Sequence, residues 1–307
     1  MPDKKDLLIL GGLAALLTAG FGWLGVSAAE PARAAASLMA IGLLLGSFLN
    51  VLVYRLPRML QADWERECAE YVGQPPPATG LSLARPHSHC PACGNTLRPW
   101  QLAPLLGYAL LRGRCGFCDE TIGIRYPLVE LLTGCAFAAI GWRLGFQPAA
   151  FAQLALCYLL LALALIDFDS RLLPDCLTQP LLWLGLLANL FHLMVPLTDA
   201  VAGAMAGYLS MWGIAAVFRA LTGKDGLGQG DFKLVAALGG WLGWSAVPLI
   251  IGFGATMSAL SGLLLIRAGR LDADQAQPFG PWLIAAGVVA WLWGGKITAW
   301  YLAAAGW

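Results

Sequence analysis

Charged residues are scarce in this sequence: lysine, arginine, aspartate and glutamate make up 12% of the 307 residues, and there are three histidines. The net charge of +1 gives no indication of a polyanionic partner, so we expect no nucleic-acid binding. Hydrophobic residues instead reach 59%, and the mean hydropathy is +0.69, well above soluble proteins. Because several apolar runs approach the roughly 20 residues that a membrane helix needs, we expect an all-α polytopic membrane protein.

Apolar runs predict a bundle of eight or nine transmembrane helices, depending on whether the first run is retained. The runs cover residues 7–29, 34–53, 126–144, 150–166, 177–194, 198–221, 232–244, 248–266 and 282–301. The first run exceeds the length of a usual signal-peptide core, which favours an uncleaved helix. Lys4 and Lys5 precede it and place the N-terminus in the cytoplasm by the positive-inside rule.

The distribution of charge divides the chain into four predicted parts. Residues 1–33 hold an extra N-terminal transmembrane segment, and residues 34–56 hold a second transmembrane helix. Residues 57–125 carry most of the charge, and three consecutive prolines break helical structure in their middle, so we expect a small cytoplasmic segment there. Residues 126–307 return to apolar runs and form the remaining transmembrane bundle.

Four of the eight cysteines form two Cys-x-x-Cys pairs inside this polar segment. They are Cys90, Cys93, Cys115 and Cys118, and 21 residues separate the pairs. The spacing is typical of a tetrahedral four-cysteine site, in which each pair presents two thiolates to one Zn²⁺. A redox dithiol or unliganded thiols are the alternatives, but one pair is enough for redox chemistry and free thiols would oxidise. We therefore expect structural zinc, which would supply folding free energy to a segment with little core.

Two aspartates lie at the ends of apolar runs, where an ionisable side chain is costly. Asp167 closes the fourth run, and Asp231 follows the loop Gly228-Gln229-Gly230 at the start of the seventh. The predicted topology places both at the cytoplasmic face. Two adjacent carboxylates share one proton and activate water, as in aspartic proteases. The residues alone leave a second interpretation open, in which Asp231 stabilises a helix N-terminus and Asp167 pairs with Arg171.

Three other acids have structural explanations that we favour over catalytic ones. Asp175 follows a proline and is expected to cap the next helix. Asp169 is expected in a loop that faces water. Glu130 lies one turn inside the third run, where we expect its side chain to reach the interface or to pair with Arg125.

A set of short motifs follows one another along the chain. They are Gly46-Ser47-Phe48-Leu49-Asn50, Arg55-Leu56-Pro57, the two Cys-x-x-Cys pairs, Arg125-Tyr126-Pro127-Leu128-Val129-Glu130, Ile166-Asp167, Leu173-Pro174-Asp175, Gly228-Gln229-Gly230-Asp231-Phe232-Lys233 and Pro278-Phe279-Gly280-Pro281. As a set they resemble the bacterial type IV prepilin peptidase family over most of residues 40–300. The span at residues 7–29 looks like an addition to the usual pattern of that family.

The resemblance implies a bifunctional enzyme of the inner membrane with its active site facing the cytoplasm. Members of this family cut the leader peptide from type IV prepilins or type II secretion pseudopilins after a glycine. They then methylate the new N-terminal residue with S-adenosylmethionine. By resemblance the catalytic residues are Asp167 and Asp231, and the zinc ligands are Cys90, Cys93, Cys115 and Cys118. The methyl-transfer site has no recognisable motif, and residues 57–125 are the expected place for it.

The substrate of such an enzyme has a basic leader followed by an apolar helix, which would lie in the membrane with its cleavage point near the interface. Small residues such as Gly203 and Gly207 are candidate contacts for that helix. Two alternatives remain open. One is a peptidase without methyl transfer, similar to the archaeal preflagellin peptidases. The other is a transporter or assembly scaffold, in which the acids relay ions or fix helices and the zinc segment docks a partner.

Overall fold

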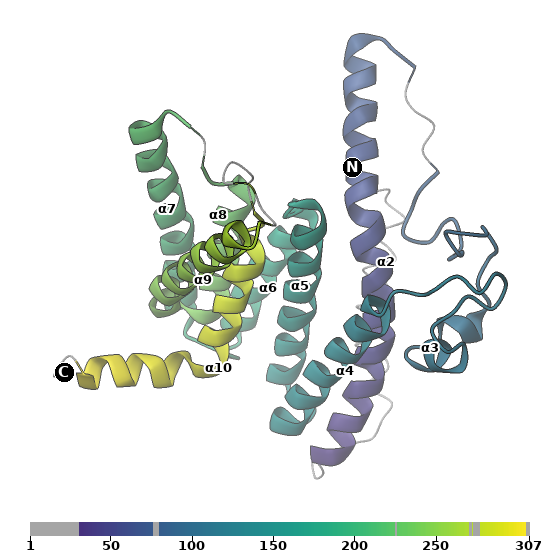
Figure 1. The fold of residues 1–307 in the computed structure, drawn as a ribbon. Helices are drawn as coiled ribbons and strands as arrows, with labels where there is room; N and C mark the ends of the chain where they lie inside the picture. Colours follow the sequence, from purple (N-terminus) through teal and green to yellow (C-terminus); the bar gives the residue numbers. More distant parts are fainter. Residues whose placement is uncertain (1–30, 76–79, 225, 270–271, 273–276, 305–307) are drawn as a thin grey trace. The chain divides into compact units, whose positions relative to one another are not determined.

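The computed structural model describes residues 31–75, 80–224, 226–269, 272 and 277–304, and the first predicted span, residues 7–29, lies outside them. Within these residues the regular structure is helical, apart from two isolated β-bridges. The elements are α2 (Pro31–Val72), η1 (Pro99–Leu102), α3 (Leu106–Leu110), α4 (Arg125–Leu144), α5 (Pro148–Ser170), α6 (Asp175–Leu190), α7 (Leu197–Thr222), α8 (Gln229–Leu242), η2 (Trp244–Ala246), α9 (Val247–Arg267) and α10 (Gly280–Ala304) (Figure 1). They form two compact units, Met1–Ala150 and Phe151–Trp307.

Six of the described helices are long and apolar enough to cross a membrane: α2, α4, α5, α7, α9 and α10. The chain is therefore a multi-pass, all-α membrane protein, as its composition predicts. The predicted count of eight or nine spans is not confirmed. The helices at two of the predicted spans, α6 and α8, have 16 and 14 residues, fewer than a perpendicular span of a bilayer requires.

The first unit is built on close packing between α2 and α4 (Figure 1). Gly46 of α2 permits it, because a Cβ atom placed there would lie 2.8 Å from the backbone Cα of Glu130. One helical turn earlier, Gly42 faces Phe137 and the backbone of Gly134 in the same way. Small residues at this spacing let the backbones of membrane helices approach closely, so these glycines determine where α4 crosses α2.

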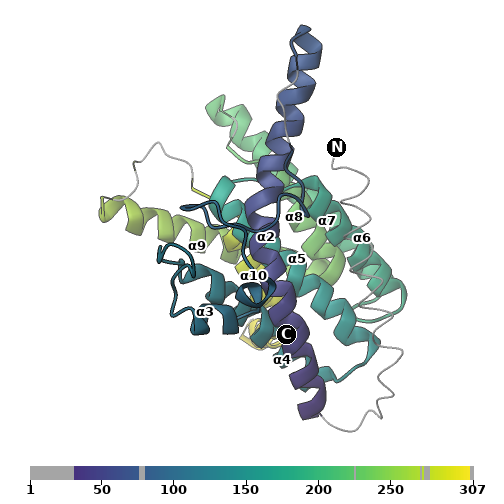
Figure 2. The ribbon, with the colours of Figure 1, turned by 90° about the vertical axis from the view of Figure 1, so that its right-hand side faces the viewer.

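Helix α2 continues well beyond its predicted end, through Pro57 to Val72. A proline inside a helix removes one backbone hydrogen bond and usually kinks or ends the helix. Here the residues around Pro57 are packed, since Leu56 and Met59 are 4% and 6% exposed. Figure 2 shows the last turns of α2 standing clear of α4.

The second unit is arranged around α8, which contacts α6, α7, α9 and α10. Ten of the 14 residues of α8 are buried, so this helix is enclosed on all sides although it is short. Glycines make that enclosure possible: a Cβ on Gly207 of α7 would lie 2.7 Å from the Val235 carbonyl oxygen of α8. A Cβ on Gly203 of α7 would likewise clash with the carbonyl oxygen of Gly239 in α8. The two α7 glycines are therefore covered by α8.

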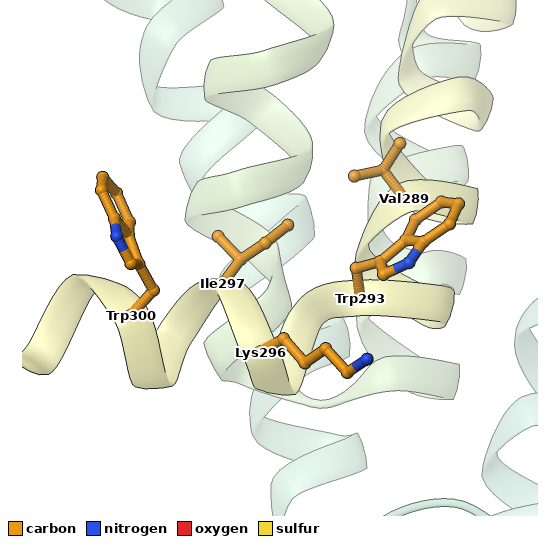
Figure 3. A pocket seen from close by; sticks show the side chains of 5 residues that line it. All are labelled: Val289, Trp293, Lys296, Ile297 and Trp300. Atoms are coloured by element: carbon orange, nitrogen blue, oxygen red, sulfur yellow. The ribbon is translucent and has the colours of Figure 1, made fainter.

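The last helix, α10, bends along its course (Figure 1). Figure 3 shows the bend between Val289 and Ile297. The side chains drawn there line a surface pocket of about 320 Å³. The adjacent Gly294 and Gly295 fall in this stretch, and paired glycines are a common cause of helix kinks. The bend leaves the first half of α10 packed against the bundle of the second unit, where Leu283 and Ala286 are fully buried.

Candidate active site and metal centre

Both Cys-x-x-Cys pairs fold into the same turn. In the first, the Cys90 amide donates to the Asn95 carbonyl at 3.0 Å, and the Gly94 amide donates back to the Cys90 carbonyl at 2.9 Å. In the second, Cys115 and Asp119 make the equivalent bonds at 2.8 and 3.0 Å, with Glu120 in the place of Asn95. A single β-bridge flanks each turn. The segment therefore contains a structural repeat, which follows the Cys-x-x-Cys-x-x-Thr pattern that occurs twice in its sequence.

The repeated turns bring all four cysteine sulfurs within 4.8 Å of one another. The Cys90 and Cys118 sulfurs are 3.8 Å apart, far beyond a disulfide bond, and all eight cysteines are free. A tetrahedral zinc ion with Zn–S bonds of about 2.3 Å requires sulfurs about 3.8 Å apart. Amides of Cys93 and Ala92 directed at the Cys90 sulfur lower the pKa of that thiol to about 7, whereas burial and the three neighbouring thiols raise the pKa of the Cys118 thiol to about 12. The four residues fit a tetrahedral thiolate site for a metal ion.

The polar segment is attached to the α2–α4 pair by two buried side chains. Arg55 is 7% exposed, and its guanidinium donates to the carbonyls of Ser82, Leu83 and Pro86 at 2.9, 3.2 and 2.7 Å. These residues lead into a surface cavity of about 650 Å³ beside the first cysteine turn. It is lined by Arg85, Pro86, His87, His89, Gly94 and Thr96.

The second attachment is Glu130 of α4, which is 9% exposed. Its Oε2 accepts a hydrogen bond from the Leu105 amide at 2.8 Å. Leu105 has a φ of 59° and a ψ of −43°, a positive-φ conformation that a non-glycine residue adopts only when its surroundings hold it there. The sequence predicts that the Glu130 side chain reaches the membrane interface or pairs with Arg125. In the structure this side chain is buried and holds the polar segment through Leu105, which is a structural role.

Asp167 lies near the end of α5 and is 5% exposed. Its Oδ2 is buried and has no hydrogen-bond partner among the described residues. The backbone amide of Gly280 faces the carboxylate from the start of α10. A buried carboxylate oxygen without a partner is costly for stability, and such atoms are common where a site is built to hold a water or a proton.

Asp231 lies in the first turn of α8 and is 9% exposed. The Gly228 amide faces its carboxylate, so the glycine-rich loop wraps back onto the acid that follows it. Gly230 has a steric reason to lack a side chain, because a Cβ there would lie 2.8 Å from the Cβ of Leu173. The loop therefore approaches the α5–α6 connection more closely than any other residue at position 230 would allow.

The structure brings the two aspartates together. The Asp167 charge acts directly on Asp231, and Leu173 lies against both glycines that support them, Gly230 and Gly280. All these residues belong to the second unit. Two buried, like-charged carboxylates repel each other, so one proton shared between them is the favoured state. The arrangement is chemically able to activate water for attack on an amide.

Asp175 is placed differently from the prediction. Pro174 occupies the cap of α6 and no side chain caps the helix, so the capping prediction for Asp175 is wrong. Asp175 instead pairs with Lys233 of α8, whose ammonium lies 2.7 Å from both carboxylate oxygens. This ion pair joins α6 to α8 two residues beyond Asp231. Asp169 is exposed, as expected, although it belongs to α5 rather than to a loop.

The family model of the bacterial peptidase A24 N-terminal domain matches residues 40–144, and that of the type IV leader peptidase family matches residues 154–265. The chain belongs to the type IV leader peptidase family. A prepilin leader peptidase/N-methyltransferase of Pseudomonas aeruginosa is 46% identical over 282 residues, 91% of this chain and 97% of the relative. Proteins of the same name from Pseudomonas putida and Burkholderia pseudomallei are 47% and 45% identical over 89% and 86% of this chain, and over 95% and 86% of their own lengths. No solved structure matches the chain.

In this leader peptidase the N-terminal family match contains the cysteine turns, and the second match contains both aspartates. These six residues are identifiable from the sequence because their type and spacing are unusual. The motif Pro278-Phe279-Gly280-Pro281 is also visible in the sequence, but its residue types do not indicate that Gly280 contacts Asp167.

Proposed function

We propose that this protein removes the leader peptide from type IV prepilins or type II secretion pseudopilins and then methylates the new N-terminal residue. The pair of buried aspartates, Asp167 and Asp231, carries the proposal. Burying two neighbouring acids in a membrane bundle is energetically costly, and acids in such positions are usually functional. The chain matches these relatives over nearly their whole lengths, and their printed name, prepilin leader peptidase/N-methyltransferase, supports both activities.

The proposed hydrolysis uses both carboxylates. One aspartate is ionised and takes a proton from a water molecule held between them, and the other is protonated and donates a hydrogen bond to the scissile carbonyl. The resulting hydroxide attacks the carbonyl carbon. The amine then leaves with a proton from the dyad, which restores the shared-proton state. The buried Oδ2 of Asp167, which has no protein partner among the described residues, is the natural acceptor for that water.

Methyl transfer is assigned to the polar segment, residues 57–125, with S-adenosylmethionine as the methyl donor. This cofactor supplies an activated methyl group to the free amine that cleavage releases. A cavity of about 650 Å³ lies beside the first cysteine turn in the described part of the segment. Its size supports this location, because it is large enough to hold a small molecule. Cys90, Cys93, Cys115 and Cys118 would hold a structural Zn²⁺ that fixes the walls of the recess.

The proposed orientation places both activities at the cytoplasmic face of the bacterial inner membrane. Arg55 and Arg58 follow the apolar part of α2, and Lys224 lies in the connection between α7 and α8, as the positive-inside rule expects for cytoplasmic ends. The substrate would reach the dyad from the lipid, with its apolar helix among the membrane helices of residues 126–307. The partners are therefore prepilins or pseudopilins and membrane lipid.

Replacing each aspartate with asparagine tests the proposal. Asparagine keeps the size of the side chain but neither takes the proton from water nor restores it to the leaving amine, so Asp167→Asn and Asp231→Asn should each lower prepilin cleavage at least about 10²-fold. The control is Asp169→Asn, on the same helix but exposed, which should cleave normally. The cleavage rate of each purified variant is measured in detergent with a type IV prepilin as substrate and is compared with that of the unaltered protein.

Mass spectrometry of the products tests both steps at once. A leader-free pilin that carries one added methyl group at its N-terminus is expected from the unaltered enzyme. Cleavage at the normal rate by both asparagine variants would refute the dyad. A free amino terminus on every cleaved product, with S-adenosylmethionine present, would leave a peptidase without methyl transfer.

A further inference from the structure

The residues that precede α10 are fastened to α9 by one amide side chain. The Gln277 Nε2 donates to the Ser258 carbonyl at 2.5 Å and to the Ser258 hydroxyl at 2.8 Å. Its Oε1 accepts from the Ser261 hydroxyl at 3.4 Å. Ser258 is 9% exposed, and Ser261 and Gln277 are half-buried, so these bonds are partly buried. Hydrogen bonds between the two elements satisfy polar groups that are costly to bury without a partner.

Helix α9 provides a notch for that amide. A Cβ atom on Gly262 would lie 3.1 Å from the Gln277 Nε2 and 3.2 Å from its Oε1, so a larger residue would push the amide away. Ser258, Ser261 and Gly262 thus share one face of α9 and accept a side chain of this length. The contact is a specific fit between the two elements.

Gln277 lies three residues before Gly280, which faces Asp167. A Cβ atom on Gly280 would lie 2.7 Å from the Asp167 Oδ2, so only glycine allows the start of α10 to come this close. Pro278 and Phe279 separate the two residues, and the proline removes one of the free backbone torsions. The Phe279 carbonyl accepts the first helical bonds of α10, from the amides of the second and third residues after Gly280. A displacement of Gln277 therefore reaches Gly280 through a short, restricted link.

We propose that Gln277 is a positioning residue for hydrolysis, which holds the amino end of α10 so that the Gly280 amide orients the Asp167 carboxylate. The inference rests on the proposed role of Asp167 in cleavage. Gln277 itself touches neither aspartate. It acts through Gly280, and α9 serves as the fixed support.

The rate of hydrolysis depends on the position of the Asp167 carboxylate relative to the reacting atoms. A backbone amide and the positive end of a helix stabilise and direct a carboxylate, and both depend on close approach. Misplacing a catalytic group by about 1 Å costs on the order of 10²-fold in rate. Loss of the Gln277 bonds should therefore lower kcat for cleavage while the binding of the prepilin helix, and hence KM, stays the same.

The first test removes the anchor. Gln277→Met keeps the length of the side chain without its hydrogen bonds and should lower kcat about 10- to 100-fold, with KM within about twofold of the unaltered value. Ser258→Ala removes one of the three bonds and should lower kcat by a smaller factor. The matched control is Thr256→Val, which deletes a hydroxyl on the same helix that bonds only the Gly252 carbonyl.

The second test crowds the carboxylate directly. Gly280→Ala should displace the Asp167 side chain and lower kcat at least as much as Gln277→Met. Its matched control is Gly287→Ala, two turns further along α10, where a Cβ would lie 2.8 Å from a methyl group of Leu238. Both substitutions crowd a side chain by a similar amount, but only one of those side chains belongs to the dyad.

The unfolding transition of each purified variant in detergent, compared with that of the unaltered protein, reports whether the variant is folded. Folded Gln277→Met and Gly280→Ala with normal kcat for cleavage would overturn the inference. An equal loss of kcat in Gly287→Ala or Thr256→Val would overturn it as well, since the effect would then be unspecific. If Asp167→Asn also cleaves normally, the proposed function fails; if Asp167→Asn is inactive and the α10 variants are normal, only this inference fails.

Discussion

Gly207 of α7 offers the sharpest test of how the second unit holds Asp231. The three atoms nearest to a Cβ placed on Gly207 are all backbone atoms of α8: the Val235 oxygen at 2.7 Å, the Val235 carbon at 2.9 Å and the Ala236 nitrogen at 3.0 Å. Backbone atoms cannot rotate away as a side chain does. Gly207→Ala must therefore push α7 and α8 apart.

The magnitude follows from two opposing effects. Overpacking a closely fitted contact costs about 1–3 kcal/mol. Replacing glycine with alanine inside a helix returns up to about 1 kcal/mol through lower backbone entropy in the unfolded chain. A Cβ on Gly213, on the same helix, would have no atom within 4 Å, so Gly213→Ala has only the second effect. The difference between the two variants isolates the packing cost, about 1–3 kcal/mol.

The measurement is the unfolding of both variants in the same detergent, together with the rate of prepilin cleavage. We expect Gly213→Ala to be at least as stable as the unaltered protein and Gly207→Ala to be less stable. Cleavage should fall in Gly207→Ala as well, because Asp231 lies one helical turn before Val235. Equal stability of the two alanine variants, with equal cleavage, would refute the close α7–α8 contact.

Two further predictions concern the first unit. Removing the metal with a chelator, or replacing Cys93 with serine, should abolish zinc in metal analysis and make residues 80–124 sensitive to limited proteolysis; a full complement of zinc in Cys93→Ser would contradict the four-cysteine site. Glu130→Leu should leave the Leu105 amide without its acceptor at a cost of about 1–3 kcal/mol and speed hydrogen exchange there, whereas Glu130→Gln, which keeps an acceptor oxygen, should have a smaller effect; unchanged exchange in Glu130→Leu would contradict the attachment.

The candidate site was predictable from the sequence because its residues are chemically out of place. Asp167 and Asp231 are acids at the ends of apolar runs, and the paired cysteines have the spacing of metal ligands. Such signals depend on residue type, which the sequence states directly. The membrane helices were predictable for the same reason, and α4, α7 and α9 begin and end within two residues of the predicted limits.

The failures all involve contacts between distant parts of the chain. Pro57 predicts the end of a helix, yet α2 continues because its neighbours Leu56 and Met59 are buried. Asp175 has the local surroundings of a cap, but its carboxylate pairs with Lys233, 58 residues away, which the local sequence does not indicate. A proline inside a helix costs about 3 kcal/mol, and burial of the neighbouring side chains of α2 offsets that cost.

The enclosure of α8 has a consequence for how the enzyme is made. A helix with no lipid-facing side gains little from entering the bilayer alone, so α8 should settle only after the neighbours that surround it have been synthesised. The glycine that faces Asp167 opens α10. The dyad should therefore become active only after both α8 and α10 have been synthesised and packed together.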